Sequence, residues 1–502
     1  MKSDFTRNAR WMLINIVAGL VACSCGPQHK AGQDRPNVLL IFTDQQNINM
    51  MSAAGNPDLH TPAMDRLADR GVMFMQSYCT SPVCGPARSS IISGRMPHET
   101  GVEWNGDAMK EEIVNAGEIF RNAGYYTVWA GKWHLPESYP QQAKARQKTI
   151  RGFEMLPFHD PEVDNWMLGS ETDPSLTEAV VAFIEGYDQK QPFFLGVSYH
   201  NPHDICFYPR KDGWFSPEDS LLEIRYYGFE YRLPDVIGTH PSSYPNLPAL
   251  PENFKASPDE PEFIRDKRRY HKEYGMETKL AFEEFGELEW RGYLHAYHRL
   301  TELVDGEIGK VLQALAEKGL DDNTIMVFTS DHGDGAAAHQ WAAKLSLYEE
   351  SSKVPLIFSW KHHIPAGRID HQHLVSQIDI LPTLCDYAGI QERPSFTGKS
   401  LRQIIEQPAS LWRDYLVVEL ADYKPDPSRK GRMVRTADFK YNVYSKGVDN
   451  EQFFNLQDDP GECDDLARNP VYTPAIEKHR RLLKEWMEKT GDPFTCESGD
   501  VP

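Results

Sequence analysis

The sequence lacks several features that would assign it to a well-known class of protein. Its 53 Lys and Arg residues are outnumbered by 73 Asp and Glu residues, which gives a formal net charge of −20. This charge argues against a general nucleic-acid-binding surface, and any anionic substrate would depend on local cations. The eight cysteines include no CxxC pair and follow no regular framework, so they indicate no disulfide pattern. No internal repeat is visible, and 502 residues suffice for one large core and a smaller domain.

The N-terminal segment also lacks an apolar run as long as a membrane span. The apolar run Trp11–Ala22 follows three basic residues and is shorter than the roughly 20 residues of a membrane span, so residues 1–22 are predicted to be a signal peptide. Its end, Leu20–Cys23, resembles a bacterial lipobox, which implies lipidation of Cys23 and a polar tether over residues 23–35. We therefore expect an exported bacterial lipoprotein, periplasmic or at the cell surface, that touches the membrane only through its anchor. Ordinary cleavage nearby, or a simple apolar tail, is the alternative.

Continuous apolar runs alternate with helical segments over most of the chain. Such runs are typical of strands buried on both faces of a parallel sheet. They lie at Asn37–Thr43, Val72–Gln76, Tyr126–Ala130, Pro192–Tyr199, Thr324–Thr329 and Val354–Ser359. Helices are predicted between them, including Glu112–Asn122 and a long one from about Tyr293 to Lys318. The predicted fold class is α/β, with a large mainly parallel sheet between helices.

Two changes in the pattern predict the domain organisation. A catalytic domain is expected over residues 36–410, with an insertion at about 204–292 that shows no clear strand alternation. This insertion is interpreted either as a lid or substrate-facing lobe, or as a solvated surface excursion. Residues 411–502 contain short strand-like runs and one helix, which predicts a smaller α+β domain built on an antiparallel sheet.

The run Cys84-Gly85-Pro86-Ala87-Arg88 combines a thiol, a proline and a guanidinium at short spacing. Pro86 suits a first helical position, so a helix is expected to begin just past Cys84. Backbone N–H groups and the helix dipole would then favour an anion beside the thiol. The alternative is that Cys84 has a structural role, in a disulfide with Cys79.

Two aspartates follow predicted buried strands far apart in the sequence. Asp44 comes directly after the first strand, and Asp331 follows Thr324–Thr329. Functional groups in α/β sheets gather at the carboxyl ends of strands, so these carboxylates are placed to share a cation. Each has a polar neighbour, Gln45 and His332, that could complete the site. Asp44 taken alone would equally suit a turn or a helix cap.

Further basic and titratable groups follow the other strands. Lys132 and His134 lie two residues apart after Tyr126–Ala130, and on an extended segment both would point into one pocket. A surface lysine beside a packed aromatic residue is the alternative. Pro202-His203 follows Pro192–Tyr199, and His200 competes with His203 as the functional histidine.

The motifs together resemble the type I, formylglycine-dependent sulfatase family of the alkaline phosphatase-like superfamily. The match spans roughly residues 36–467 outside the insertion and rests on Cys84–Arg88 with Ser93-Gly94-Arg95, Gly131-Lys132-Trp133-His134, Pro202-His203, Asp331–Asp334 with His339 and Lys344, Ser376–Leu384, and Asp459–Glu462. The resemblance implies an alkaline phosphatase-like fold and hydrolysis of sulfate esters. The expected substrates are sulfated glycans or oligosaccharides.

The resemblance implies two cofactors. A maturase would convert Cys84 to formylglycine, although Ala87 stands where the modification motif more often has Ser. Ca²⁺, with Mg²⁺ as the alternative, would be bound by the side chain at position 84 together with Asp44, Gln45, Asp331 and His332. Gln45 replaces a frequent Asp and His332 a frequent Asn. A nitrogen donor is unusual for hard Ca²⁺, so the alternatives for His332 are a place at the edge of the ligand shell or a hydrogen bond to the sulfate.

The resemblance also implies catalytic roles. Arg88, Lys132 and Lys344 would supply positive charge, and one hydroxyl of the hydrated formylglycine would attack sulfur. His203 would protonate the departing alcohol and His134 would take a proton from the second hydroxyl. His339 is expected in the pocket or just behind it.

Other functions stay open at this point. A phosphonate monoester or phosphodiester hydrolase of the same superfamily can use the same CxPxR nucleophile, and a lipoprotein that binds sulfated glycan without turnover is a further alternative. Sugar contacts, or else plain packing, are expected of Trp104, Trp214 and the run Arg265–Arg269.

Overall fold

The computed structural model describes residues 35–135, 149–156, 169–207, 246–273, 285–421, 426 and 428–497, with the side chains of residues 149, 207 and 269–273 left out. The predicted signal peptide, the lipobox Cys23 and Trp214 lie outside these residues, as do all but the last residue of the tether. Within the described part of the chain, no helix is both long enough and apolar enough to cross a membrane.

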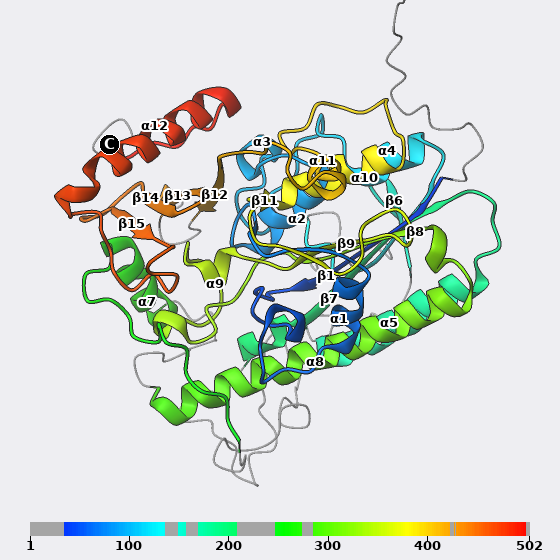
Figure 1. The fold of residues 1–502 in the computed structure, drawn as a ribbon, viewed down its shortest axis with the longest axis horizontal. Helices are drawn as coiled ribbons and strands as arrows, with labels where there is room; N and C mark the ends of the chain where they lie inside the picture. The colour runs from blue at the N-terminus through cyan, green and yellow to red at the C-terminus, as the bar shows by residue number, and fades with distance from the viewer. Residues whose placement is uncertain are drawn as a thin grey trace, which may run out of the picture. The chain divides into compact units, whose positions relative to one another are not determined.

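A nine-stranded sheet runs through the described residues (Figure 1). Its order is β10 (Arg368–Asp370), β2 (Gly71–Phe74), β9 (Leu356–Ser359), β8 (Thr324–Ser330), β1 (Asn37–Asp44), β7 (Phe193–Pro202), β4 (Tyr126–Gly131), β6 (Phe153–Met155) and β5 (Thr149–Ile150). The central strands β8, β1, β7, β4 and β6 are parallel, whereas β9 pairs antiparallel with β8 and β2. The predicted mainly parallel α/β sheet is therefore confirmed.

Strand β1 is apolar without alternation because both of its faces pack into hydrophobic cores. Val38, Leu40 and Phe42 face one hydrophobic core, and Leu39 and Ile41 face another. The first core is covered by α2 (Cys84–Ser93), α4 (Ala116–Asn122), α10 (Ile380–Tyr387) and α11 (Arg402–Glu406), and the second by α1 (Pro62–Asp69), α5 (Gly169–Gly186) and α8 (Glu287–Glu317). Figure 1 shows these two sets of helices on opposite sides of the sheet.

The C-terminal part carries a four-stranded antiparallel sheet, as the sequence predicts. Its strands follow one another in the order β12 (Tyr415–Ala421), β13 (Lys430–Thr436), β14 (Phe439–Tyr444) and β15 (Glu451–Asn455), and α12 (Thr473–Thr490) packs on one face. The other face packs against α7 (Glu262–Glu273), where the rings of Phe263 and Tyr444 stack 4.6 Å apart. Phe263 and Ile264 are fully buried, so this described part of the predicted insertion is not a solvated excursion.

Some element boundaries differ from the sequence expectation for local reasons. The helix predicted from Glu112 begins at Ala116, because the Asn115 side chain accepts the Glu118 N–H and caps the helix there. The strand predicted from Val354 begins at Leu356, directly after Pro355. Helix α2 begins at Cys84 itself, with Pro86 as its third residue.

Short elements complete the described chain. They are β3 (Ser77–Tyr78) paired with β11 (Val375–Ser376), α3 (Pro97–Thr100), α9 (Glu349–Ser352), and the 3₁₀ turns Ser52–Ala54, His203–Phe207, Asp321–Asn323, Ala338–Gln340, Gln377–Asp379 and Pro470–Tyr472.

Candidate active site

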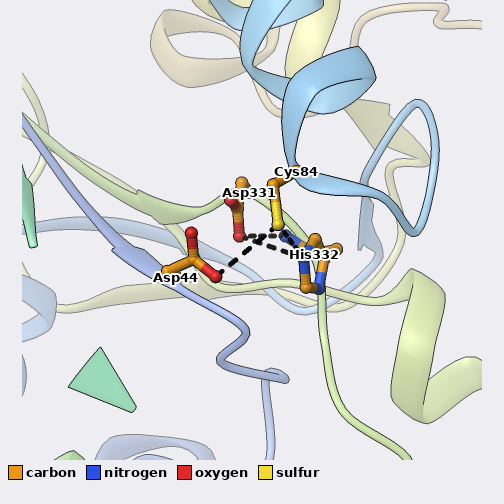
Figure 2. A group of neighbouring side chains, drawn as sticks. All are labelled: Asp44, Cys84, Asp331 and His332. Carbon is orange, nitrogen blue, oxygen red and sulfur yellow. Dashed lines mark hydrogen bonds and ion pairs between the residues drawn. The ribbon is translucent and has the colours of Figure 1, made fainter. Parts of the chain in front are cut away.

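Four candidate ligands meet at one edge of the sheet. Strands β1 and β8 are parallel neighbours, so their carboxyl ends bring Asp44 and Asp331 together. Cys84 and His332 complete the group, and the ligand atoms of all four lie within 4.8 Å of one another (Figure 2). All four side chains are buried. The structure thus brings together four of the five residues expected to surround the cation.

Arg88 holds the two carboxylates in place. Its Nη2 donates to Asp44 Oδ2 at 2.7 Å and its Nε to Asp331 Oδ2 at 2.8 Å. Its Nη1 donates to the Ser198 hydroxyl at 2.7 Å and to the Lys132 carbonyl at 2.8 Å. With four hydrogen bonds to the protein and only 2 % of its surface exposed, the Arg88 side chain is directed at the carboxylates.

Lysines surround the thiol and the first carboxylate. Lys132 Nζ lies 2.7 Å from Asp44 Oδ2, and Lys344 Nζ donates to Cys84 Sγ at 2.9 Å. Burial raises the pKa of Asp44, but the nearby cations, Lys132 foremost, more than offset this and hold it well below its usual range. This site therefore keeps positive charge beside position 84, which suits an anion.

The thiol of Cys84 is free and sits in a polar environment. Burial and Asp44 raise its pKa, but Lys344 and His332 lower it by more, so the net pKa is lowered. Cys79 is buried and also free, so the structure does not contain the alternative Cys79–Cys84 disulfide. The N–H of Gly85 donates to Asn105 Oδ1 at 2.8 Å, which fixes the start of α2.

The donor set fits a divalent cation. Two buried carboxylates supply hard oxygen ligands. His332 Nδ1 lies 2.8 Å from the Gly333 carbonyl, which can only accept, so Nδ1 carries a proton and the ring is held with Nε2 toward the cluster, 3.1 Å from Cys84 Sγ. The backbone N–H of Gln45 donates to Asp331 Oδ1 at 3.0 Å, whereas its side-chain amide donates to Asp334 Oδ2 at 2.8 Å. Gln45 is therefore at the site, but its amide is engaged by Asp334.

Lys132 and His134 do not lie on one extended segment as predicted, although both residues are at the site. Strand β4 ends at Gly131, whose φ of 92° leaves the extended region, and His134 has a φ of 59°. A Cβ at Gly131 would lie 2.0 Å from the Ser198 carbonyl oxygen, so glycine is required there. His134 is half-buried, and desolvation together with Lys132 and Arg88 lowers its pKa well below the usual value.

His203 rather than His200 is placed beside the carboxylates. His203 Nε2 lies 3.9 Å from Asp44 Oδ1, whereas His200 Nδ1 lies 3.3 Å from the Thr172 hydroxyl on α5. The turn between them is fixed by Asp173, whose two oxygens accept the N–H groups of His200 and Asn201 at 2.9 and 3.0 Å.

Asp173 makes the stability of this turn depend on pH. Burial raises its pKa to about 8, although the two N–H groups lower it. Between pH of about 4 and about 8 the folded protein binds the proton that the unfolded chain releases, so this contribution is present in acid and lost as the pH rises through 8. We expect Asp173→Asn, which is uncharged throughout, to gain about 2–4 kcal/mol relative to wild type between pH 5 and pH 8.5 in urea unfolding. A difference that stays constant would contradict this, and Asp188→Asn, at an exposed position just beyond α5, is the control.

Sequence reasoning missed several residues that support the site. The buried carboxylate of Asp334 accepts from the Tyr293 hydroxyl at 2.8 Å, and the Tyr297 hydroxyl donates to the Gln45 carbonyl at 2.5 Å. Their signal was available, because two tyrosines four residues apart lie on one face of the predicted long helix. Ser198, the polar residue that Arg88 contacts, interrupts an otherwise apolar predicted strand.

His339 lies in a different group. Its ring stacks on Tyr348 with centroids 3.9 Å apart, and its Nε2 lies 3.4 Å from Asn253 Nδ2. Glu350 and Glu462 are its acidic neighbours. It is therefore not among the residues that surround Cys84 in Figure 2.

Comparison with known proteins agrees with this geometry. The Sulfatase family matches residues 36–390, and the family described as N-sulphoglucosamine sulphohydrolase, C-terminal, matches residues 337–489. A Δ4,5-hexuronate-2-O-sulfatase from Bacteroides thetaiotaomicron is 31% identical over 95% of this chain and 93% of its own length. An N-acetylglucosamine-6-O-sulfatase from the same organism is 28% identical over 95% and 91%.

Solved structures give the same result. A 2-O GAG sulfatase superimposes with a TM-score of 0.74 at 29% identity and covers 93% of this chain and 95% of its own. A phosphonate monoester hydrolase of Agrobacterium radiobacter shares the fold, with a TM-score of 0.69 at 20% identity over 91% and 96%. With the family match covering most of the chain, this protein belongs to the sulfatase family, has its alkaline phosphatase-like fold, and hydrolyses sulfate esters.

Proposed function

We propose that this sulfatase removes sulfate from sulfated glycan fragments of the glycosaminoglycan type. The observation that carries the proposal is similarity along almost the whole chain to sulfatases named for hexuronate 2-O-sulfate and N-acetylglucosamine 6-O-sulfate. The local cations at Cys84 support it, because they attract an anionic ester that the net charge of −20 does not.

Cys84 is the residue that we propose to be converted to formylglycine by a maturase. The buried position of its side chain between the Asp44–Asp331 pair and Lys344 supports this role. In its hydrated form, a formylglycine at this position supplies a hydroxyl nucleophile next to the sulfate-binding charges. Because Ala87 stands where the modification motif more often has Ser, experiment must determine whether a particular maturase recognises this chain.

Asp44, Asp331 and His332 are proposed to hold Ca²⁺, with Mg²⁺ as the alternative, together with the side chain at position 84 and with Gln45 at the margin of the site. The cation supplies positive charge where the sulfate oxygens bind. Arg88 orients both carboxylates toward it through its two charge-assisted hydrogen bonds.

The remaining residues bind the ester and move protons. Lys132 contacts Asp44, Lys344 contacts Cys84, and both bind sulfate oxygens. His203, next to Asp44, gives a proton to the departing alcohol, and His134 accepts the proton released at position 84. Arg88 acts through the carboxylates that it holds.

Export with a lipid anchor remains part of the proposal, and its support is the N-terminal sequence alone. The basic residues, the apolar run and Cys23 together fit a lipoprotein signal. A protein placed outside the cytoplasm would meet glycan fragments directly.

Defined sulfated sugars test the proposed substrate class. Matured protein is incubated with sulfated hexuronate- and glucosamine-containing mono- and disaccharides, and inorganic sulfate is measured. We expect at least one sugar to be hydrolysed with a kcat/KM about 100-fold or more above that for an aryl phosphodiester, because binding energy from the sugar is used in the transition state. A preference for the phosphodiester would favour the phosphonate and phosphodiester hydrolase alternative. Binding of a sulfated sugar without sulfate release, by protein shown to carry the modification, would favour a binding protein.

A further inference from the structure

The loop that carries Lys344 has an unusual backbone. Between Asp334 and Leu345, six non-glycine residues lie in the left-handed region, namely Ala336, Ala337, His339, Gln340, Ala343 and Leu345, with φ from 45° to 75°. Such conformations are unfavourable for residues with a Cβ and persist only where the surroundings hold them. The loop therefore needs support from neighbouring segments.

Much of that support comes from the segment 246–273, which belongs to the predicted insertion. The N–H groups of His339 and Gln340 donate to the carbonyls of Asn253 and Phe254, each at 2.7 Å. The carbonyls of the same two loop residues accept from Arg268 Nη2 at 2.7 Å and Nη1 at 2.9 Å. Both polar edges of this turn are thus bonded to the insertion.

Arg268 is itself rigidly placed. Its Nε and Nη2 donate to Glu260 Oε2 and Oε1 at 2.9 and 2.6 Å, a bidentate pair that fixes the plane of the guanidinium. Glu260 also accepts from the Tyr348 hydroxyl at 2.9 Å. Glu260 is 3 % exposed and the Arg268 side chain 13 %, so solvent screens this pair little.

The arginine connects to the active site through one more residue. Its guanidinium lies over the ring of Trp341, 4.8 Å from the centroid. Trp341 Nε1 donates to the Lys344 carbonyl at 3.0 Å. Lys344 Nζ in turn lies 2.9 Å from Cys84 Sγ.

We propose that Arg268 is a positioning residue for the reaction: through the His339 and Gln340 carbonyls and through Trp341, it holds Lys344 against position 84. The insertion then has a definite task, since its described part holds a loop of the catalytic domain in place. The inference rests on the proposed role of Lys344 in binding sulfate.

The inference is tested with three single variants, each made in the wild-type protein and in Lys344→Ala. Arg268→Met removes the guanidinium, Arg268→Lys keeps a charge but cannot reach both carbonyls and Glu260, and Trp341→Phe removes only the indole N–H. The matched control is Asp266→Asn, which breaks the 3.1 Å ion pair of the same helix with Arg429. Each change is also made in a Lys344→Ala background, and kcat is measured at high enzyme concentration on the sulfated sugar that wild type hydrolyses fastest.

We expect Arg268→Met and Arg268→Lys to lower kcat about tenfold or more and Trp341→Phe about threefold, with Asp266→Asn unchanged. In the Lys344→Ala background the same changes should have no further effect on kcat, because the group that they position is gone. Circular dichroism and the unfolding midpoint establish whether each variant is folded. If Arg268→Met is not folded, Trp341→Phe tests the same connection to Lys344.

Different results would contradict the positioning role of Arg268 and the sulfate-binding role of Lys344. Wild-type kcat in the folded variants, or an equal fold-loss with and without Lys344, overturns the positioning role while leaving the proposed function intact. Wild-type kcat in Lys344→Ala alone overturns the sulfate-binding role of Lys344 and this inference with it.

Discussion

Cys84→Ala is expected to lower sulfate release by at least about 10⁴-fold, which is the order of loss seen when a nucleophile is removed from an enzyme that depends on it. The side chain at position 84 lies within reach of Lys344 at 2.9 Å and of the Asp44, Asp331 and His332 ligand atoms. None of these four neighbouring side chains carries a hydroxyl. The measurement is kcat on the best sulfated sugar, with inorganic sulfate as the product detected.

The control is the other buried thiol nearby. Cys79→Ala removes a free cysteine whose Sγ lies 3.9 Å from the Ser351 carbonyl oxygen, and it should retain kcat within about threefold. Mass spectrometry of the peptide that contains position 84 should show an aldehyde in wild type expressed with a maturase. Full activity in Cys84→Ala, or full activity in wild type whose peptide still carries the thiol, would contradict the proposal. Ala87→Ser shows whether the alanine limits modification.

Arg88→Met is expected to destabilise the protein by about 3–5 kcal/mol when divalent cations are chelated, the usual result of breaking a buried ion pair. Asp44 and Asp331 have no exposed surface, and without the guanidinium the buried Asp331 carboxylate would lose its 2.8 Å ion pair while Asp44 would keep Lys132. Urea unfolding followed by circular dichroism gives the free energy. Catalysis should fall as well, because the carboxylates lose their orientation.

Added Ca²⁺ should restore part of this loss. A cation bound between the carboxylates stabilises the folded state by mass action, and it replaces some of the charge that Arg88 supplied. We therefore expect Ca²⁺ to raise the unfolding free energy of wild type, and to do so at least as strongly in Arg88→Met. Arg95→Met, at a partly exposed pair with Glu99, should cost under about 1 kcal/mol. The ion-pair assignment fails if Arg88→Met is as stable as wild type in chelator, and the cation assignment fails if Ca²⁺ stabilises neither protein.

The pairing of Asp44 with Asp331 could be predicted from the sequence because it depends on a local rule. Each residue follows a run of apolar residues, and such runs become parallel strands whose carboxyl ends meet. The same rule placed Lys132 at this edge of the sheet, whereas the choice of His203 over His200 depended on the resemblance to the family. The prediction failed in detail for His134, since the close approach of Gly131 to the Ser198 carbonyl changes the direction of the chain.

The contacts of Arg88 could not be predicted in this way. Its partners Asp44, Ser198 and Asp331 lie 44, 110 and 243 residues away in the chain. The motif identifies the arginine, but only the packing of α2 against β1, β7 and β8 shows that four of its five N–H groups are bonded to protein groups. The contacts of Arg268 could not be predicted either, since the charged run around it is equally typical of exposed surface.

The sequence by itself determined the α/β fold, the residue types at the strand ends and the membership of Cys84 in a recognisable motif, because apolar periodicity and short motifs are local properties. Only the tertiary structure decided which of these groups meet, that Arg88 faces the carboxylates, and that the insertion supports the Lys344 loop. The physical reason is that burial and charge pairing arise between segments hundreds of residues apart. Their energies depend on distances that no local pattern specifies.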